Sequence, residues 1–234
     1  MRVDDFVLLG RTVPEKSKKY GYKVCSAGYS AELGGLMRVY PLPVQNGLRQ
    51  WSRLRLELER PRDDSRCESW ALKTRDMASV LEVGSDKTKR ASYAAFFDGM
   101  LARSVEQLNR DRASLGIIKP RGFQCHFGSR RGMTCPSQQM LFDCMDDKFG
   151  AEAADLVPQM VFEDADGEHC LQVREIGAYE WIRTNRDRAA QLWMNYRLNK
   201  DRDVYLLVGN MASHRNVWLI INIITFKQEA TLFA

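Results

Sequence analysis

The stretch Leu54–Glu59, LRLELE, alternates strictly between apolar and charged side chains. Its three leucines fall on one face, while Arg55 and the two glutamates fall on the other. This period of two is typical of a β-strand with one face buried and the other in water. The stretch therefore predicts a half-buried strand of a curved sheet.

Two further apolar segments precede this strand, Phe6–Gly10 and Leu36–Tyr40. Pro41 and Pro43 close the second of them, and Pro61 closes LRLELE. Proline cannot donate a hydrogen bond to a neighbouring strand, so it usually marks the end of a strand. Short strands with such breaks between them predict a small barrel or curled sheet in the N-terminal part.

The pattern changes to a helical one between Ser92 and Arg112. Phe97, Leu101, Val105 and Leu108 recur at spacings of four, four and three residues, which places them on one stripe of a helix. We expect a helix of about five turns near residues 92–112. Residues 121–150 show no clear period.

The last hundred residues predict an α+β region. Gln159–Glu163 and His169–Val173 flank DADG, a sequence suited to a hairpin turn. Glu175–Leu198 has the period of a helix, and Val204–Val208 and Val217–Phe226 are rich in β-branched residues. The expected fold class is therefore α+β, an N-terminal barrel-like region followed by a ββαββ region.

Charge is distributed unevenly along the chain. The sequence has 35 basic and 30 acidic residues, a net charge of +5. Residues 1–135 contain 25 basic and 15 acidic residues, a net charge of +10, whereas residues 136–234 contain 10 basic and 15 acidic residues, a net charge of −5. We therefore expect a basic barrel-like region over residues 1–136 and an acidic α+β region over residues 137–234. Alternatively, folding interleaves the two halves and the field averages out.

Neither a membrane span nor a metal site is expected. The longest apolar run, VWLIINIITF, has ten residues, too few to span a bilayer. The apolar segment at the N-terminus is too short for a signal peptide. The six cysteines form no CxxC pair, which favours free thiols and a cytoplasmic location. The spacing of Cys125, His126, Cys135 and Cys144 matches no compact zinc pattern.

Several catalytic motifs are absent. The sequence contains no Walker A loop, GxGxxG, HExxH or nucleophile elbow. An NTPase, a dinucleotide enzyme and an ordinary hydrolase are therefore disfavoured, and we expect no cofactor.

A basic, aromatic arm follows the first apolar segment. Within RTVPEKSKKYGYK it gathers five cations and two tyrosines, namely Arg11, Lys16, Lys18, Lys19, Tyr20, Tyr22 and Lys23. Lysine and arginine neutralise phosphates, and tyrosine rings stack on bases. The alternative is that the tyrosines pack on the sheet and the lysines are simply solvated.

Two other groups of polar residues are candidate sites. His214 and Arg215 lie in GNMASHRN, between two apolar strands, where a loop projects toward a ligand. Asp63, Asp64 and Glu68 would suit a metal-dependent phosphodiesterase if other acids lay near them, although Pro61-Arg-Asp-Asp-Ser is also an ordinary turn.

Several stretches resemble an uncharacterised family of bacterial and phage-borne proteins. They are RTVPEKSKKYGYKVCSAG (11–28), MRVYPLPV (37–44), RPRDDSRCESW (60–70), SLGIIKP (114–120), GEHCLQVREIGAYEW (167–181), DVYLLVGN (203–210) and HRNVWLIINI (214–223). The resemblance implies an intracellular protein of a mobile-element or defence-type locus, with an N-terminal barrel similar to an OB-fold. Family members often carry cysteines in the hairpin before the second helix, where this chain has only Cys170.

These observations predict a non-enzymatic protein that binds DNA or RNA. The predicted contacts are the seven residues of the arm together with His214 and Arg215, and the acidic C-terminal region is expected to face a protein partner. The alternatives are a metal-dependent nuclease that uses Asp63, Asp64 and Glu68, and a non-catalytic subunit of a larger assembly.

Overall fold

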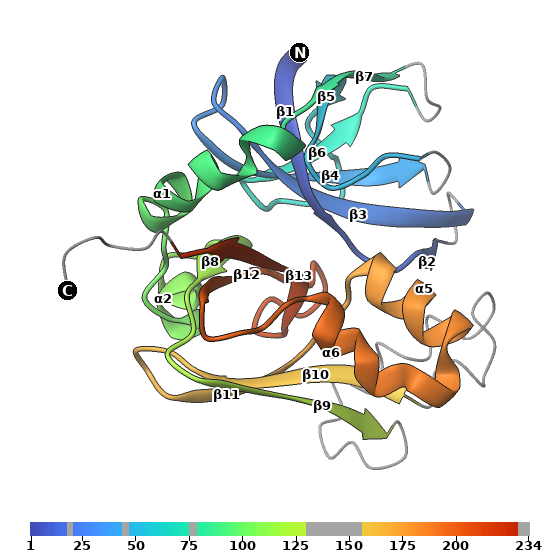
Figure 1. Cartoon of the computed structure of the whole chain (residues 1–234). Coiled ribbons are helices and arrows are strands. Elements are labelled where there is room, and N and C mark those ends of the chain that lie inside the picture. Colours follow the sequence, from blue (N-terminus) through green and yellow to red (C-terminus); the bar gives the residue numbers. More distant parts are fainter. Residues whose placement is uncertain (18–20, 44–46, 75–78, 130–155, 229–234) are drawn as a thin grey trace.

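The computed structural model describes residues 1–17, 21–43, 47–74, 79–129 and 156–228. The chain forms three layers (Figure 1): a barrel, a middle sheet, and an outer sheet flanked by helices. The seven strands of the first layer are β1 (Arg2–Arg11), β2 (Glu15–Ser17), β3 (Gly21–Ser30), β4 (Gly35–Pro43), β5 (Ser52–Glu59), β6 (Ser69–Leu72) and β7 (Val80–Ser85).

The first layer closes into a five-stranded barrel. The strand order is β1-β3-β4-β6-β5, and β5 pairs with β1 to close the ring. Strand β7 adds to β5, and β2 adds to β3. The closed barrel is consistent with the OB-like expectation, and the chain as a whole is mixed α and β with sheet predominating.

The alternation in LRLELE is confirmed as the inner face of this barrel. Leu54, Leu56 and Leu58 are fully buried in the barrel core, whereas Glu57 and Glu59 are exposed. Each leucine removes apolar surface from water, which stabilises the fold by about 1.5–3 kcal/mol per side chain. The segments Phe6–Gly10 and Leu36–Tyr40 also lie in barrel strands, β1 and β4.

The middle sheet has apolar side chains on both faces. Its order is β13-β12-β8, formed by β8 (Leu115–Ile118), β12 (Arg202–Asn210) and β13 (Trp218–Lys227). Along β12, Tyr205 and Leu207 face the barrel, while Leu206 and Val208 face the outer sheet. A sheet buried on both faces explains why VWLIINIITF is an unbroken apolar run.

The outer sheet is a three-stranded antiparallel one. It is formed by β9 (Phe123–Ser129), β10 (Leu156–Glu163) and β11 (Glu168–Gln172), in the order β11-β10-β9. Because β8 and β9 pair with β12 and β10, strand pairing crosses residue 136, where the sequence changes from basic to acidic. The two hairpins of the expected ββαββ region belong to different sheets, although their side chains pack in one core cluster.

The single helix expected over residues 92–112 is wrong. The structure has η2 (Lys87–Ser92), α1 (Tyr93–Asp98) and α2 (Val105–Arg110) instead. Between the last two, Ala102 N donates to Ile117 O at 2.9 Å, which ties the chain to the middle sheet. The predicted stripe is divided because Phe97 packs between the barrel and the middle sheet, while Val105 and Leu108 pack on the far side of that sheet.

The helix expected over Glu175–Leu198 is also divided. Its parts are α5 (Ile176–Thr184), η4 (Arg186–Gln191) and α6 (Leu192–Asn195), and the break falls at Asn185, whose φ and ψ are −135° and 46°. Seven apolar residues gave this stretch its helical period, and five of them are buried while Trp193 and Tyr196 are partly buried; the buried five are Ile176, Tyr179, Ile182, Ala189 and Leu192.

The DADG turn holds α2 in place. Gly167 has a φ of +137°, a conformation that favours glycine. Asp164 is buried and accepts a hydrogen bond from Val105 N at 2.9 Å, at the start of α2. Ser104, the N-cap of α2, donates to Asp166. These two turn acids therefore stabilise a helix end, a role beyond the solubility that surface acids provide.

The barrel meets the middle sheet where β1 crosses β13. A Cβ at Gly10 would lie 3.0 Å from both Asn222 Cβ and Ile221 Cγ2. At this crossing Asn222 Nδ2 donates to Leu9 O at 2.6 Å. The absence of a side chain at Gly10 therefore allows the two strands to approach closely.

We predict that Gly10→Val destabilises the protein by about 1–3 kcal/mol, because the new side chain would overpack this crossing. The measurement is the free energy of unfolding in urea. Gly84→Val is the control, since no atom lies within 4 Å of a Cβ placed there. Equal stability of the two variants would contradict the role given to the crossing.

Candidate functional site

The backbone of the basic arm contains paired strands. After β1, strand β2 pairs with the start of β3, with Lys16 opposite Tyr22 and Glu15 opposite Lys23. Lys18, Lys19 and Tyr20 lie outside the described residues. The arm thus extends the edge of the barrel sheet at the β2 end of β3 (Figure 1).

Arg11 lies at the base of the arm and is partly buried. Burial lowers the pKa of its guanidinium, and the nearby carboxylates of Glu175 and Glu180 act in the opposite direction. The exposed Glu180 carboxylate partly offsets the charge of Arg11, which is therefore a weaker candidate for a phosphate contact than a cation with no acid nearby.

His214 and Arg215 lie in the connection between β12 and β13. Arg215 is exposed, and its Nη2 donates to Ser65 Oγ at 2.7 Å. His214 Nδ1 lies 2.9 Å from Ser213 Oγ. Arg215 therefore lies beside the turn after β5.

A cleft of about 890 Å³, here called the basic cleft, lies between η2, the start of β12 and the chain after α6. Four cations from these three segments line it: Lys87, Arg90, Arg197 and Arg202. The polar side chains of Gln50, Thr88 and Asn195 also line it. These four cations were not predicted from the sequence, although the basic run KTKR contains Lys87 and Arg90.

The electrostatic balance of the basic cleft is positive. Within the described parts of the chain, none of the four cations forms an ion pair. The one acid among the lining residues, Glu175, is partly buried and accepts a hydrogen bond from Tyr196 Oη. Burial raises the pKa of Glu175, which disfavours its charged form. The cleft is therefore suited to an anion.

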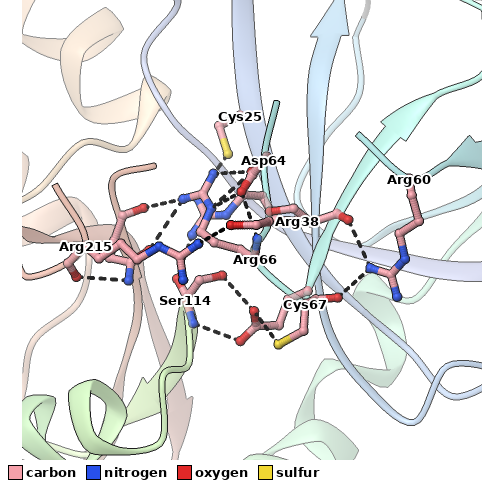
Figure 2. A network of polar contacts seen from close by, with 12 residues as sticks. Cys25, Arg38, Arg60, Asp64, Arg66, Cys67, Ser114 and Arg215 are labelled. Atoms are coloured by element: carbon pink, nitrogen blue, oxygen red, sulfur yellow. Dashed lines mark hydrogen bonds and ion pairs between the residues drawn. The ribbon is translucent and has the colours of Figure 1, made fainter. Parts of the chain in front are cut away.

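A second cavity of about 560 Å³ lies where the barrel meets the edge of the middle sheet. Three arginines line it, Arg38 from β4 and Arg62 and Arg66 from the turn after β5, so we call it the arginine pocket. Figure 2 shows the polar network around it. Cys25, Asp64, Asn210 and Ser213 also line the pocket.

The candidate nuclease carboxylates are bound within this network and do not converge. Asp64 Oδ2 pairs with Arg66 Nη2 at 2.6 Å, and Glu68 accepts from Ser114 N at 2.8 Å and Ser114 Oγ at 2.9 Å. Asp63 is exposed. Over residues 1–17, 21–43, 47–74, 79–129 and 156–228, no three His, Cys, Asp or Glu side chains are placed to hold a metal ion.

The zinc candidates are only partly described. Cys125 and His126 are neighbours on β9, so their side chains point to opposite faces. His126 Nε2 lies 2.9 Å from Gln159 Oε1. Cys135 and Cys144 lie outside the described residues, while Cys25, Cys67, Cys125 and Cys170 are free thiols.

Comparison with known proteins recognises a family only for the barrel. A family model described as a domain of unknown function, DUF8758, matches residues 3–96, which span all the barrel strands. No curated protein matches. The bacterial or phage origin implied by the resemblance stays a prediction.

One solved structure, the crystal structure of the tetrameric p202 HIN2, is similar over 98% of this chain and 95% of that chain, with 9% identity and a TM-score of 0.33. A likeness of this size carries no argument about function. Within the described residues, no helix is long and apolar enough to cross a membrane.

The ion pair of Asp64 and Arg66 predicts a pH-dependent stability. Burial acts to raise the pKa of Asp64, but hydrogen bonds, chiefly from Arg66, lower it from its ordinary value of 3.8 to about 2. Because the folded-state pKa is depressed, this stabilisation is present above about pH 4 and is lost as the pH falls through about 2. It amounts to about 2 kcal/mol.

The measurement is urea unfolding of the wild type and Asp64→Asn at pH 5 and pH 2. We expect their difference in unfolding free energy to shrink by about 2 kcal/mol at the lower pH. Asp63→Asn is the exposed control and should track the wild type. If the wild type and Asp64→Asn differ in unfolding free energy by the same amount at both pH values, the ion pair is not the source of that difference.

Proposed function

We propose that the protein is a non-enzymatic nucleic-acid-binding protein whose basic cleft and basic arm contact phosphates. The observation that carries this proposal is the convergence of Lys87, Arg90, Arg197 and Arg202 on one cleft without ion-pair partners among the described residues. Phosphates release condensed counterions when such cations neutralise them, which supplies affinity that does not depend on base sequence.

The basic cleft draws its cations from both the basic and the acidic part of the chain. Residues 1–135 carry 25 basic and 15 acidic residues. Two of the cleft cations, Lys87 and Arg90, come from this basic part, whereas Arg197 and Arg202 come from the acidic part. Several acids of the second part are used internally, since Asp164 and Asp166 hold the start of α2 and Asp203 pairs with Lys119 at 3.0 Å.

The proposal includes three sets of contacts with the nucleic acid. The arm lysines would contact phosphates, Tyr20 and Tyr22 would stack on bases, and His214 and Arg215 would add further contacts. It also includes a role in a mobile-element or defence-type locus. A protein partner for the acidic C-terminal region also stays a prediction; Glu163 and Glu168 at the hairpin end are exposed and available for it.

We expect binding of single-stranded DNA or RNA to weaken about fiftyfold between 50 and 200 mM salt, as four phosphate contacts give a slope near −3. The measurement is fluorescence anisotropy with labelled 20-nucleotide DNA, RNA and duplex DNA. Arg90→Gln/Arg197→Gln should weaken binding about tenfold at low salt and make the slope shallower by about 1.4. Affinity that does not vary with salt would contradict the proposal.

A matched control separates the cleft from net charge. Arg121→Gln/Arg183→Gln removes the same charge from two exposed positions that line neither cavity and, like the cleft cations, form no ion pair among the described residues. It should change binding less than twofold, roughly the scale of a screened surface charge. Lys16→Gln/Lys18→Gln/Lys19→Gln tests the arm in the same assay, and equal losses in all three variants would show only a non-specific effect of net charge.

A further inference from the structure

The arginine pocket contains a buried positive charge that the protein leaves unbalanced. Arg38 is 4% exposed, and within the described residues no carboxylate lies at ion-pair distance from it. Its Nη2 donates to Ser114 O at 2.6 Å and its Nη1 to Cys25 Sγ at 3.2 Å, while its Nε is buried without a partner (Figure 2). A buried charge is costly unless a counter-ion or hydrogen bonds compensate it.

The neighbouring Arg66 shows what a compensated guanidinium looks like in the same pocket. It is 7% exposed, pairs with Asp64 through Nε and Nη2, and donates from Nη1 to Asn210 O at 2.8 Å. A guanidinium has five N–H donors, and the two hydrogen bonds of Arg38 reach only a carbonyl and a thiol. Arg38 therefore retains both charge and donors for a further partner.

The backbone of the middle sheet makes room for this guanidinium. A Cβ at Gly209 would lie 2.9 Å from Arg38 Nη2 and 2.6 Å from Ile221 Cδ1. Because position 209 has no side chain, the guanidinium of β4 reaches across to the edge of the middle sheet. Arg38 is thus held against the pocket wall by contacts from two layers.

The rest of the pocket suits an organic molecule. Pro41, Ala71, Leu219 and Ile221 provide apolar wall, and Arg62 is exposed. Two other lining acids, Glu59 and Asp63, are also exposed, where water and salt screen them. A volume of about 560 Å³ is within the range of small-molecule sites.

We propose that the arginine pocket binds a small organic oxyanion, a carboxylate or phosphate group on an apolar body. The oxyanion lies against Arg38 and Arg62, and the apolar body lies on Leu219 and Ile221. Guanidinium and oxyanion groups form short, charge-assisted hydrogen bonds, and these are stronger where water is excluded. The site is independent of the basic cleft, so it does not rest on nucleic-acid binding.

The test uses Cys25 as a local reporter, since its thiol lines the pocket and accepts from Arg38. Iodoacetamide alkylation of the full-length protein is followed by peptide mass spectrometry. The probes are adenosine 5′-monophosphate and benzoate, with adenosine and benzyl alcohol as their neutral counterparts. At about 10 mM, ten times a Kd of about 1 mM, a bound probe slows alkylation of Cys25 about tenfold.

Cys67 is the internal reference, because it is exposed and does not line the pocket. If only one of the two anions protects Cys25, and Cys67 is unaffected, that anion shows whether the pocket binds a phosphate or a carboxylate. Failure of both anions to protect Cys25, or equal protection by the neutral compounds, overturns the proposal. Arg90→Gln/Arg197→Gln should retain full protection, which separates this site from the basic cleft.

Arg38→Gln should abolish the protection, and thermal unfolding of this variant checks that it folds. Arg62→Gln changes an exposed side chain and should weaken protection about threefold, the scale of one partly exposed charge contact. If Arg38→Gln does not fold, Arg62→Gln decides, and unchanged protection in that variant overturns the proposal.

Discussion

The crossing of β1 over β13 is the contact on which the rest of the structure depends. It joins the barrel to the middle sheet through the close approach at Gly10 and the hydrogen bond from Asn222 to Leu9 O. Consecutive residues of β13 then serve different cavities, since Ile221 lines the arginine pocket and Asn222 lines the basic cleft. Both cavities thus owe their shape to the same packing of two layers.

The two cavities use positive charge in different ways. In the basic cleft the cations are at the surface, where their field extends into water and is screened by salt. In the arginine pocket Arg38 and Arg66 are buried, and each hydrogen bond is correspondingly stronger and more costly to leave unmade. A polyanion fits the first arrangement, and a small ligand that leaves water behind fits the second.

Sequence periodicity predicted a strand or helix correctly where the apolar side chains of that segment pack into a single core. LRLELE faces only the barrel core, so its alternation identified the strand directly. The stripe of Phe97 and Leu108 misled because the two residues pack on different sides of the middle sheet, which a helical period does not reveal. The division at Asn185 has a local cause, since Asn185 caps α5 by donating from both its backbone N and its Nδ2 to Trp181 O.

The candidate site was less predictable than the fold. Arg90 and Arg202 are 112 positions apart in the numbering, and no local pattern connects them. The lysines of the arm were conspicuous because they are adjacent in sequence, whereas Arg38 stood in an ordinary strand, MRVYP. Its burial beside Gly209 depends on the packing of β4 against β12, a long-range contact.

The barrel has one further consequence, for the order of events during synthesis. All its strand pairings lie within residues 2–85, so the ring can close while the remainder is still being translated. The carbonyl acceptor of Arg38, Ser114 O, is translated after the barrel strands, so this hydrogen bond forms later than the barrel pairings. Completion of the arginine pocket therefore requires Ser114 and the lining residues between 209 and 221, all of which are translated after the barrel strands.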